Sequence, residues 1–203
     1  MPRLSSTRKE LLTAMMKEAI YEAAVSVLAE HGAAGMTMDR VAAAASMAKG
    51  SLYSYFESKQ ELLQFVHGKV VEPIQKAVEE RLRSDMPVLA KLEAILRVIF
   101  DQTAEHQELF SLLLKDDDAR LILEPTERTN RQIAVGHFAE VFRQGIDEGL
   151  FHPHDPVQLG EMFFGALLGF WQPALAAGNF QQPDQLIKPL MEIFLRGVAV
   201  TRT

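Results

Sequence analysis

Apolar residues recur at spacings of three and four along nearly the whole chain, while short alternating runs rich in Val, Ile and Thr are missing. A spacing of three to four places residues on one face of an α-helix, whereas a half-buried strand needs strict alternation. Helix-capping signals occur between the apolar stretches, as at Thr37 and at Asp155-Pro156. The sequence therefore predicts an all-α protein of about nine helices.

Composition narrows the class of protein further. The 203 residues are 48% hydrophobic and 24% charged, which excludes a disordered chain and suits one large domain or two small ones. Because cysteine is absent, disulfides and cysteine-ligated metal sites are excluded. The most apolar stretch, residues 162–171, is shorter than the roughly 18 residues of a membrane span, and no secretory apolar region begins the chain. We expect a cytoplasmic protein that does not interact with a membrane.

Charge is divided unevenly along the chain. The net charge of −6 argues against a protein that coats nucleic acid without regard to sequence. Residues 1–69 nevertheless hold 8 Lys and Arg against 7 Asp and Glu, so the acidity lies in the later two-thirds. This asymmetry is a weak indication that the two parts have different tasks.

Four helices are expected in the first third. One ends before Gly32, which can supply a C-terminal cap, and a short one follows Thr37. A third follows a break around residues 45–47, and a capping box formed by Ser58 and Glu61 starts the fourth. Pro73 predicts a kink or break in that fourth helix near residue 72.

The later helices are expected over residues 87–106, 108–115, 125–149 and 186–198, with another that starts at residue 155 and ends near Pro173 or Gly178. Asp85 is a possible cap for the first of them. Three consecutive aspartates, residues 116–118, predict a loop before Pro125. Neither this triplet nor the pair His152 and His154 has the ligand spacing of a metal site, so we expect no metal.

Three short helices within residues 16–56, with a tight break between the second and third, match a helix-turn-helix. In that motif the last helix enters the major groove of DNA and its N-terminal residues face base edges. Gly50 would allow close approach of the backbone, and Lys49 offers a cation. Hydroxyls for phosphate or base contacts come from Ser51, Tyr53, Ser54 and Tyr55. Tyr53 could equally be a packing residue.

Residues 20–63 resemble the DNA-binding domain of the TetR family of bacterial transcriptional regulators. The resemblance rests on Ala23-Ala24 through Glu30-His31-Gly32, on Thr37-Met38-Asp39-Arg40-Val41-Ala42, on Lys49-Gly50-Ser51-Leu52-Tyr53, on Tyr55-Phe56, and on Ser58-Lys59 with Glu61-Leu62-Leu63. The chain departs from the family at the turn, where Ser46-Met47-Ala48 replaces the usual Gly-Val-Ser. It departs again at Ala33, where the family commonly has an aromatic residue. Ser46 can be tolerated if its side chain satisfies backbone groups of the turn.

The resemblance implies a DNA-binding domain over residues 13–72 and an effector-binding and dimerisation domain over residues 73–203. It implies a sequence-specific regulator, a repressor that leaves a palindromic operator when a small, largely apolar effector binds. The DNA-binding candidates are Thr37, Ala48, Lys49, Gly50, Ser51, Tyr53, Ser54, Tyr55 and Lys59. The alternatives are an enzyme in a helical bundle and a DNA-binding protein without an effector. We expect no enzyme and no cofactor, because no spacing nominates a nucleophile and its base.

The second part of the chain is rich in aromatic residues, of which most must form plain core. An effector cavity is apolar with a few orienting polar groups, and the candidates are Phe100, His106, Phe110, Asn130, His137, Phe138 and Phe163. Gly165 and Gly169, four residues apart, fall on one side of a helix, where the backbone of a second copy could approach. The homodimer candidates are Phe164, Gly165, Leu168, Gly169, Leu190 and Phe194. The alternative is that these residues fold back on the chain's own core.

Overall fold

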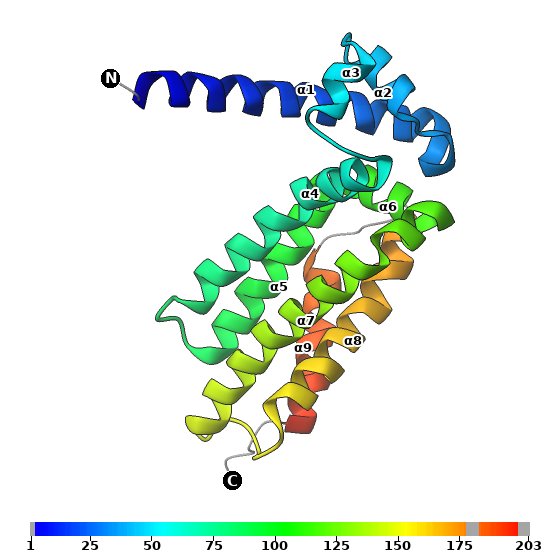
Figure 1. Ribbon diagram of the computed structural model, residues 1–203. Helices are drawn as coiled ribbons and strands as arrows, with labels where there is room; N and C mark the ends of the chain where they lie inside the picture. The colour runs from blue at the N-terminus through cyan, green and yellow to red at the C-terminus, as the bar shows by residue number, and fades with distance from the viewer. Residues whose placement is uncertain (1–2, 178–182, 199–203) are drawn as a thin grey trace. The chain divides into compact units, whose positions relative to one another are not determined.

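The computed structural model describes residues 3–177 and 183–198, and within these ranges the chain forms nine α-helices and no strand (Figure 1). In chain order the helices are α1 (Arg3–Gly35), α2 (Met38–Ala44), α3 (Lys49–Tyr53), α4 (Lys59–Leu82), α5 (Val88–Glu105), α6 (Gln107–Lys115), α7 (Asp117–Asp147), α8 (Pro156–Ala176) and α9 (Pro183–Val198). This confirms the predicted all-α class. The apolar spacing therefore predicted the helical class correctly, although several helix boundaries differ from those expected.

Helix α7 starts well before the predicted position at Pro125. The aspartate triplet is not a loop: Asp116 Oδ1 accepts a hydrogen bond of 2.9 Å from Ala119 N, and Asp117 and Asp118 occupy the first turn. Carboxylates are stabilised at a helix N-terminus by the unpaired N–H groups and the helix dipole. Three aspartates in a row therefore mark a helix start here.

Helix α4 passes through Pro73 without ending, so of the kink or break predicted near residue 72, the break is wrong. The proline removes one backbone hydrogen bond, but Val70 and Val78 on either side of it are buried. Their packing holds the helix together across the missing bond. The predicted cap at Asp85 is also wrong, because Pro87 occupies the N-cap of α5. Helix α8 runs past Pro173 to Ala176, and Gly178 lies outside the described residues.

The chain divides into two compact units. The first contains residues up to Lys69 together with the segment Leu112–Glu124, and the second contains Val70–Ser111 and the chain from Pro125 onward. Helices α4, α6 and α7 each contribute residues to both units. The segment Leu112–Glu124, the end of α6 and the start of α7, thus belongs with the first unit although its neighbours in sequence belong to the second.

The first unit is built around one face of α1. Ile20, Ala24 and Leu28, spaced by four, are no more than 1% exposed. Helices α2 and α3 add Val41 and Leu52, both fully buried. Among further buried residues are Phe56, Leu62, Leu63 and Val66, with Leu113, Ala119 and Leu123 from the segment 112–124. The result is a three-helix core capped by the start of α4.

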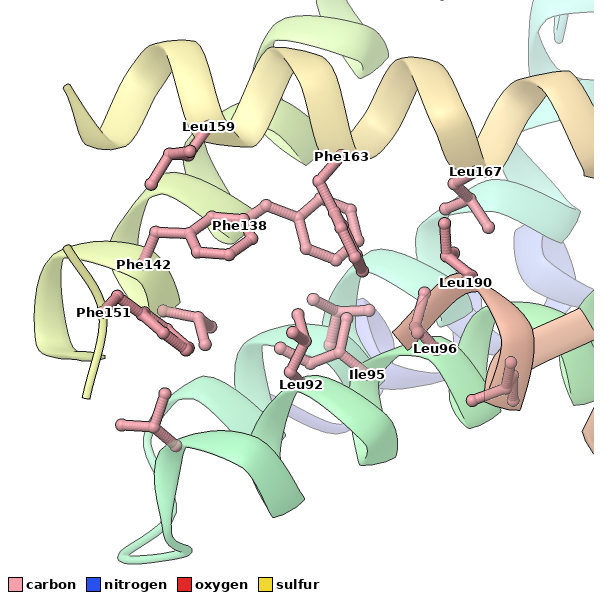
Figure 2. Close-up of a cluster of buried hydrophobic side chains, with 14 of the residues drawn as sticks. Leu92, Ile95, Leu96, Phe138, Phe142, Phe151, Leu159, Phe163, Leu167 and Leu190 are labelled. Carbon is pink, nitrogen blue, oxygen red and sulfur yellow. The ribbon is translucent and has the colours of Figure 1, made fainter. Parts of the chain in front are cut away.

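The second unit has an aromatic core that Figure 2 shows in close-up. Phe163 of α8 contacts two rings of α7, with centroids 5.0 Å from Phe138 and 5.6 Å from Phe142. Leu92 and Ile95 of α5 face these rings across the core (Figure 2). Edge-to-face pairs of this kind add to the free energy gained from burying the rings.

Helices α7 and α8 approach each other closely at Gly160. A Cβ atom added there would lie 2.7 Å from Val135 O and 3.1 Å from Ala139 N, both backbone atoms of α7. No side chain larger than hydrogen fits between the two backbones. The sequence did not single out Gly160, because nothing local distinguishes it from Gly165 or Gly169.

In the described part of the chain, none of the helices combines the length and the apolar character needed to cross a membrane.

Candidate nucleic-acid interface

Thr37 is the N-cap of α2, as predicted. Thr37 has extended backbone angles, and its Oγ1 accepts a hydrogen bond of 3.2 Å from Arg40 N. Arg40 also reaches back to α1, where its Nη1 donates to Gly35 O at 2.5 Å. Met38, Val41 and Ala42 are buried on the inner face of α2. These contacts fix the start of α2 against the end of α1.

The turn after α2 has the hydrogen bonds of a Schellman motif. Met47 N donates to Ala42 O at 2.9 Å and Ser46 N donates to Ala43 O at 3.0 Å. A Schellman motif requires the residue just after the helix C-cap to have left-handed backbone angles. Ser46 is that residue, and its φ is 53°. The departure from the family's glycine is therefore accommodated by strain in the backbone of Ser46.

Helix α3 is held by one buried side chain and exposes the rest of its polar residues. Leu52 is fully buried. The predicted residues Ala48, Lys49, Gly50, Ser51, Tyr53 and Ser54 are all exposed, and Tyr55 is half-buried. A Cβ at Gly50 would meet nothing within 4 Å, so no intramolecular packing requires a glycine there. The helix thus presents a continuous polar strip with an open backbone at its N-terminal turn.

Lys49 forms an ion pair that sequence reasoning missed. Its Nζ lies 2.7 Å from Asp39 Oδ1 of α2, and both side chains are more than half exposed. The hydrogen bond to Asp39, followed by the charge of that carboxylate, raises the pKa of Lys49. Lys49 therefore stays an ammonium ion, and an exposed pair of this kind is weak enough to yield to another anion.

The α3–α4 corner places Lys59, which is half-buried at the first position of α4. Ser58 Oγ accepts from Glu61 N at 3.1 Å, as the capping box predicts. In a capping box the Glu side chain accepts in return from the N–H of the N-cap residue, here Ser58. In this protein Glu61 Oε2 accepts instead from the preceding N–H, that of Glu57, at 2.6 Å. The corner is closed by these two bonds, and Lys59 is the first residue of α4 after it.

A trihelical unit with a tight turn before an exposed polar helix defines a helix-turn-helix DNA-binding protein. Comparisons with known proteins give the family. Residues 20–66 match the family model described as bacterial regulatory proteins, tetR family. The match covers all of α2 and α3 and the predicted candidates on them.

Relatives extend the match beyond the helix-turn-helix. The HTH-type transcriptional repressor SCO4008 of Streptomyces coelicolor is 30% identical over 134 residues, 66% of this chain and 66% of that protein. The HTH-type transcriptional repressor KstR2 of Mycobacterium tuberculosis is 26% identical over 162 residues, 77% of this chain and 75% of that protein. The solved SmeT–triclosan complex shares the fold, with a TM-score of 0.76 at 19% identity over 92% of each chain; SmeT is a repressor from Stenotrophomonas maltophilia. The chain belongs to the TetR family of bacterial transcriptional regulators.

The effector candidates in the second unit fall into two groups. Phe100, Phe138 and Phe163 are at most 1% exposed and belong to the packed core. Phe110 is also buried, at 7% exposed, and its ring lies edge-to-face with that of Trp171, with ring centroids 5.9 Å apart. Trp171 Nε1 donates to Thr103 Oγ1 at 3.3 Å, a pair that sequence reasoning missed.

The polar candidates gather between α4 and α7. Asn130 Oδ1 accepts from Gln75 Nε2 at 3.0 Å, while Asn130 Nδ2 is buried without a hydrogen-bond partner. His137 is half-buried; burial lowers its pKa, and the nearby carboxylate of Glu79 opposes that shift. His106 lies apart, at the C-cap of α5. Within the second unit, one buried N–H donor and one mainly neutral imidazole therefore come from the same face of α7.

The dimer candidates also divide. Gly165 and Gly169 are exposed, and a Cβ at either would meet nothing within 4 Å. Leu168 and Phe164 are half-buried beside them. In α9, by contrast, the candidates turn inward: Leu190 is 4% exposed, and the Phe194 ring lies 4.9 Å from that of Phe163.

For α9 the chain's own core thus takes the residues that the sequence nominated for a partner. The large apolar side chains Met162 (65% exposed) and Phe170 (48%) of α8 and Ile193 (70%) of α9 face outward instead. Sequence periodicity could not distinguish the two faces, because both α8 and α9 are apolar on more than one side. Among the described residues no group of three or more His, Asp or Glu side chains could hold a metal ion.

Proposed function

We propose that this protein is a homodimeric transcriptional repressor that binds a palindromic operator through α3 and releases it when a small, largely apolar effector binds in the second unit. The observation that carries the proposal is the strip of exposed polar residues on α3, anchored by the single buried Leu52. Named relatives that match over most of the chain are repressors, which favours repression over activation.

The DNA-binding step follows from the groups on that strip. The ammonium of Lys49 exchanges the carboxylate of Asp39 for a phosphate, and the open backbone at Gly50 allows a close approach. The hydroxyls of Ser51 and Tyr53 reach phosphates or base edges. Ser54 Oγ donates to Ser51 O at 2.6 Å, so it serves as an acceptor toward DNA.

Dimerisation uses the outward face of α8 with the exposed side chains of α9. Gly165 and Gly169 leave room for a close helix crossing, and Met162, Phe170 and Ile193 supply apolar area around it. Two-fold symmetry then sets two recognition helices about 34–36 Å apart, as successive major grooves on one side of DNA require. That symmetry is what makes the operator palindromic.

The effector is bound in the second unit beside the α4 and α7 polar groups. The free N–H of Asn130 Nδ2 donates to an oxygen of the effector, and His137, kept mainly neutral by burial, offers a second contact. Phe110 and Trp171 provide apolar surface. SmeT, which has this fold, has been solved with triclosan, which supports a small-molecule site in this class of helical unit.

The test begins by selecting the operator from a random duplex library with the purified protein. Operator affinity is then measured at two salt concentrations for wild type, Lys49→Ala and Lys59→Ala. Each lost phosphate contact should weaken binding and reduce the salt slope by about one. Lys76→Ala, which removes an exposed lysine of α4 in the second unit, is the control. If Lys49→Ala and Lys76→Ala bind alike, Lys49 does not contact the operator.

The effector is sought separately, by screening small apolar compounds for thermal stabilisation of the protein. A compound that raises the melting temperature and weakens operator binding supports the proposal. A compound whose stabilisation is unaffected by Asn130→Ala and His137→Ala binds elsewhere, and the site assigned here would be wrong.

A further inference from the structure

Helix α1 changes direction at Gly32. This residue has φ of 66° and ψ of 176°, outside the helical range, and a short new turn begins at Ala33. Met36 N closes that turn on Gly32 O at 3.0 Å. Ala33 N–H is the first donor of the new turn, a position where helices usually lack an intrahelical acceptor, and Ala33 is fully buried. A buried N–H in this position needs an acceptor from elsewhere in the fold.

That acceptor is Asp116, from the corner between α6 and α7. Its Oδ2 accepts from Ala33 N at 2.6 Å, while its Oδ1 accepts from Ala119 N at 2.9 Å. One half-buried carboxylate thus caps the start of α7 and also the turn at Ala33, which lies 83 residues before Asp116 in the sequence. Hydrogen bonds from N–H groups to an ionised carboxylate are among the stronger ones in proteins.

Gly32 is required by the same contact. A Cβ at Gly32 would lie 2.9 Å from Asp116 Oδ2, and the positive φ already disfavours any other residue. The space that a side chain would fill at this position is occupied by the carboxylate. The kink of α1 at Gly32 therefore leaves the space in which the Asp116 carboxylate binds Ala33 N–H.

The contact reaches the DNA-reading helices through a short series of bonds. The turn that Asp116 caps ends at Gly35, whose carbonyl oxygen accepts from Arg40 Nη1 at 2.5 Å. Arg40 lies in the first turn of α2, and α2 leads through the Ser46 turn into α3. The position of α2 is thus defined partly by a residue outside the segment 20–66 that matches the family.

We propose that Asp116 is a positioning residue for DNA binding, which ties the start of α7 to the Gly32–Ala33 junction and thereby sets the place of α2 and α3. Asp116 lies in the segment Leu112–Glu124 of the first unit, and both helices that flank it continue into the second unit. A displacement of α6 or α7 by an effector acts directly on this carboxylate. The role in effector response rests on the proposed function, whereas the role in holding α1 and α2 does not.

The first experiment needs no DNA and is done on the full-length protein. Hydrogen exchange of the backbone amides of residues 33–36 is compared in wild type, Asp116→Ala, Asp116→Asn and Asp118→Ala. Asp118 is an exposed aspartate of the same helix turn, so its removal is the matched control for charge. We expect exchange at Ala33 to be about ten-fold faster or more in Asp116→Ala, intermediate in Asp116→Asn, and unchanged in Asp118→Ala.

The second experiment measures affinity for the operator that wild type selects, at a temperature where circular dichroism shows every variant folded. Asp116→Ala should bind several-fold more weakly, and Asp116→Asn, which keeps one acceptor oxygen, should recover part of the loss. A residue that only stabilises the fold would lower the melting temperature and leave this affinity unchanged. If Asp116→Ala does not fold, the Asp116→Asn data decide by themselves.

Equal exchange and equal affinity in the Asp116 variants and Asp118→Ala would overturn the proposal. If no duplex is selected by wild type, the proposed function fails while the exchange result still tests the contact. If the exchange changes but operator affinity does not, the contact exists and Asp116 has no positioning role.

Discussion

Gly160→Ala is the substitution whose outcome the structure defines most sharply. An added Cβ would lie 2.7 Å from Val135 O and 3.1 Å from Ala139 N, whereas ordinary contacts begin at 3.4 Å. Both neighbours are backbone atoms of α7, so neither can rotate away. The two helices must therefore separate by several tenths of an ångström. Phe138 of α7 and Phe163 of α8, whose ring centroids lie 5.0 Å apart, must separate with them.

The expected magnitude is the balance of two terms. Overpacking a close-packed core costs about 1–3 kcal/mol, and a clash with rigid backbone belongs at the upper end of that range. Replacing glycine by alanine inside a helix also stabilises that helix by about 1 kcal/mol, which partly offsets the overpacking. We therefore expect Gly160→Ala to lower the free energy of unfolding by about 2 kcal/mol, or the melting temperature by about 4–8 °C for a chain of this size.

The matched control is Gly136→Ala in α7. Gly136 is exposed, and a Cβ there would meet nothing within 4 Å, so the helix-propensity gain of about 1 kcal/mol acts alone. Urea unfolding at one fixed protein concentration measures both variants, with fluorescence of the single tryptophan, Trp171, as a probe located in the second unit. The reasoning is refuted if Gly160→Ala is as stable as Gly136→Ala.

Three further predictions concern the turn, the dimer and the switch. Ser46→Gly should relieve the positive φ and raise the free energy of unfolding of the first unit by about 1 kcal/mol, measured by chemical denaturation; an unchanged or lower value would mean that the Ser46 backbone is not strained. Gly165→Leu and Gly169→Leu should shift the dimer toward monomer in light scattering while Gly136→Leu, on another exposed helix face, should not; intact dimers from both would reject the α8 face. Pro73→Ala should leave folding and effector binding intact but reduce, several-fold, the ratio of operator affinities without and with effector, because α4 carries residues of both units; equal ratios in the two proteins would make Pro73 irrelevant to the switch.

Local chemistry explains why much of the helix-turn-helix could be predicted from the sequence. The cap at Thr37, the break at Ser46 and the start of α4 at Ser58 each depend on residues no more than a few positions apart. The apolar period of α1 selects its buried face in the same way. These signals do not require knowledge of the rest of the fold.

Local rules failed where two local signals competed. The aspartate triplet could start either a loop or a helix, and the contacts of Asp116 with Ala119 and Ala33 decided for the helix. Pro73 could end α4, but burial of Val70 and Val78 on both sides carried the helix through. At Pro73, packing outweighed a helix-breaking preference of about 3 kcal/mol. At Asp116, hydrogen bonds to backbone N–H groups decided the outcome.

The helical class, the helix-turn-helix and its exposed polar residues could be predicted without the fold, because hydrophobic period, caps and turns act over distances of one or two helical turns. The tertiary structure alone decided which glycine lies against a neighbouring backbone, which apolar face of α9 is buried, and that Asp39 meets Lys49 and Asp116 meets Ala33. Those facts depend on how distant segments pack. A single chain's sequence does not encode that packing in any local pattern, since the same apolar stripe can cover the chain's own core or a partner.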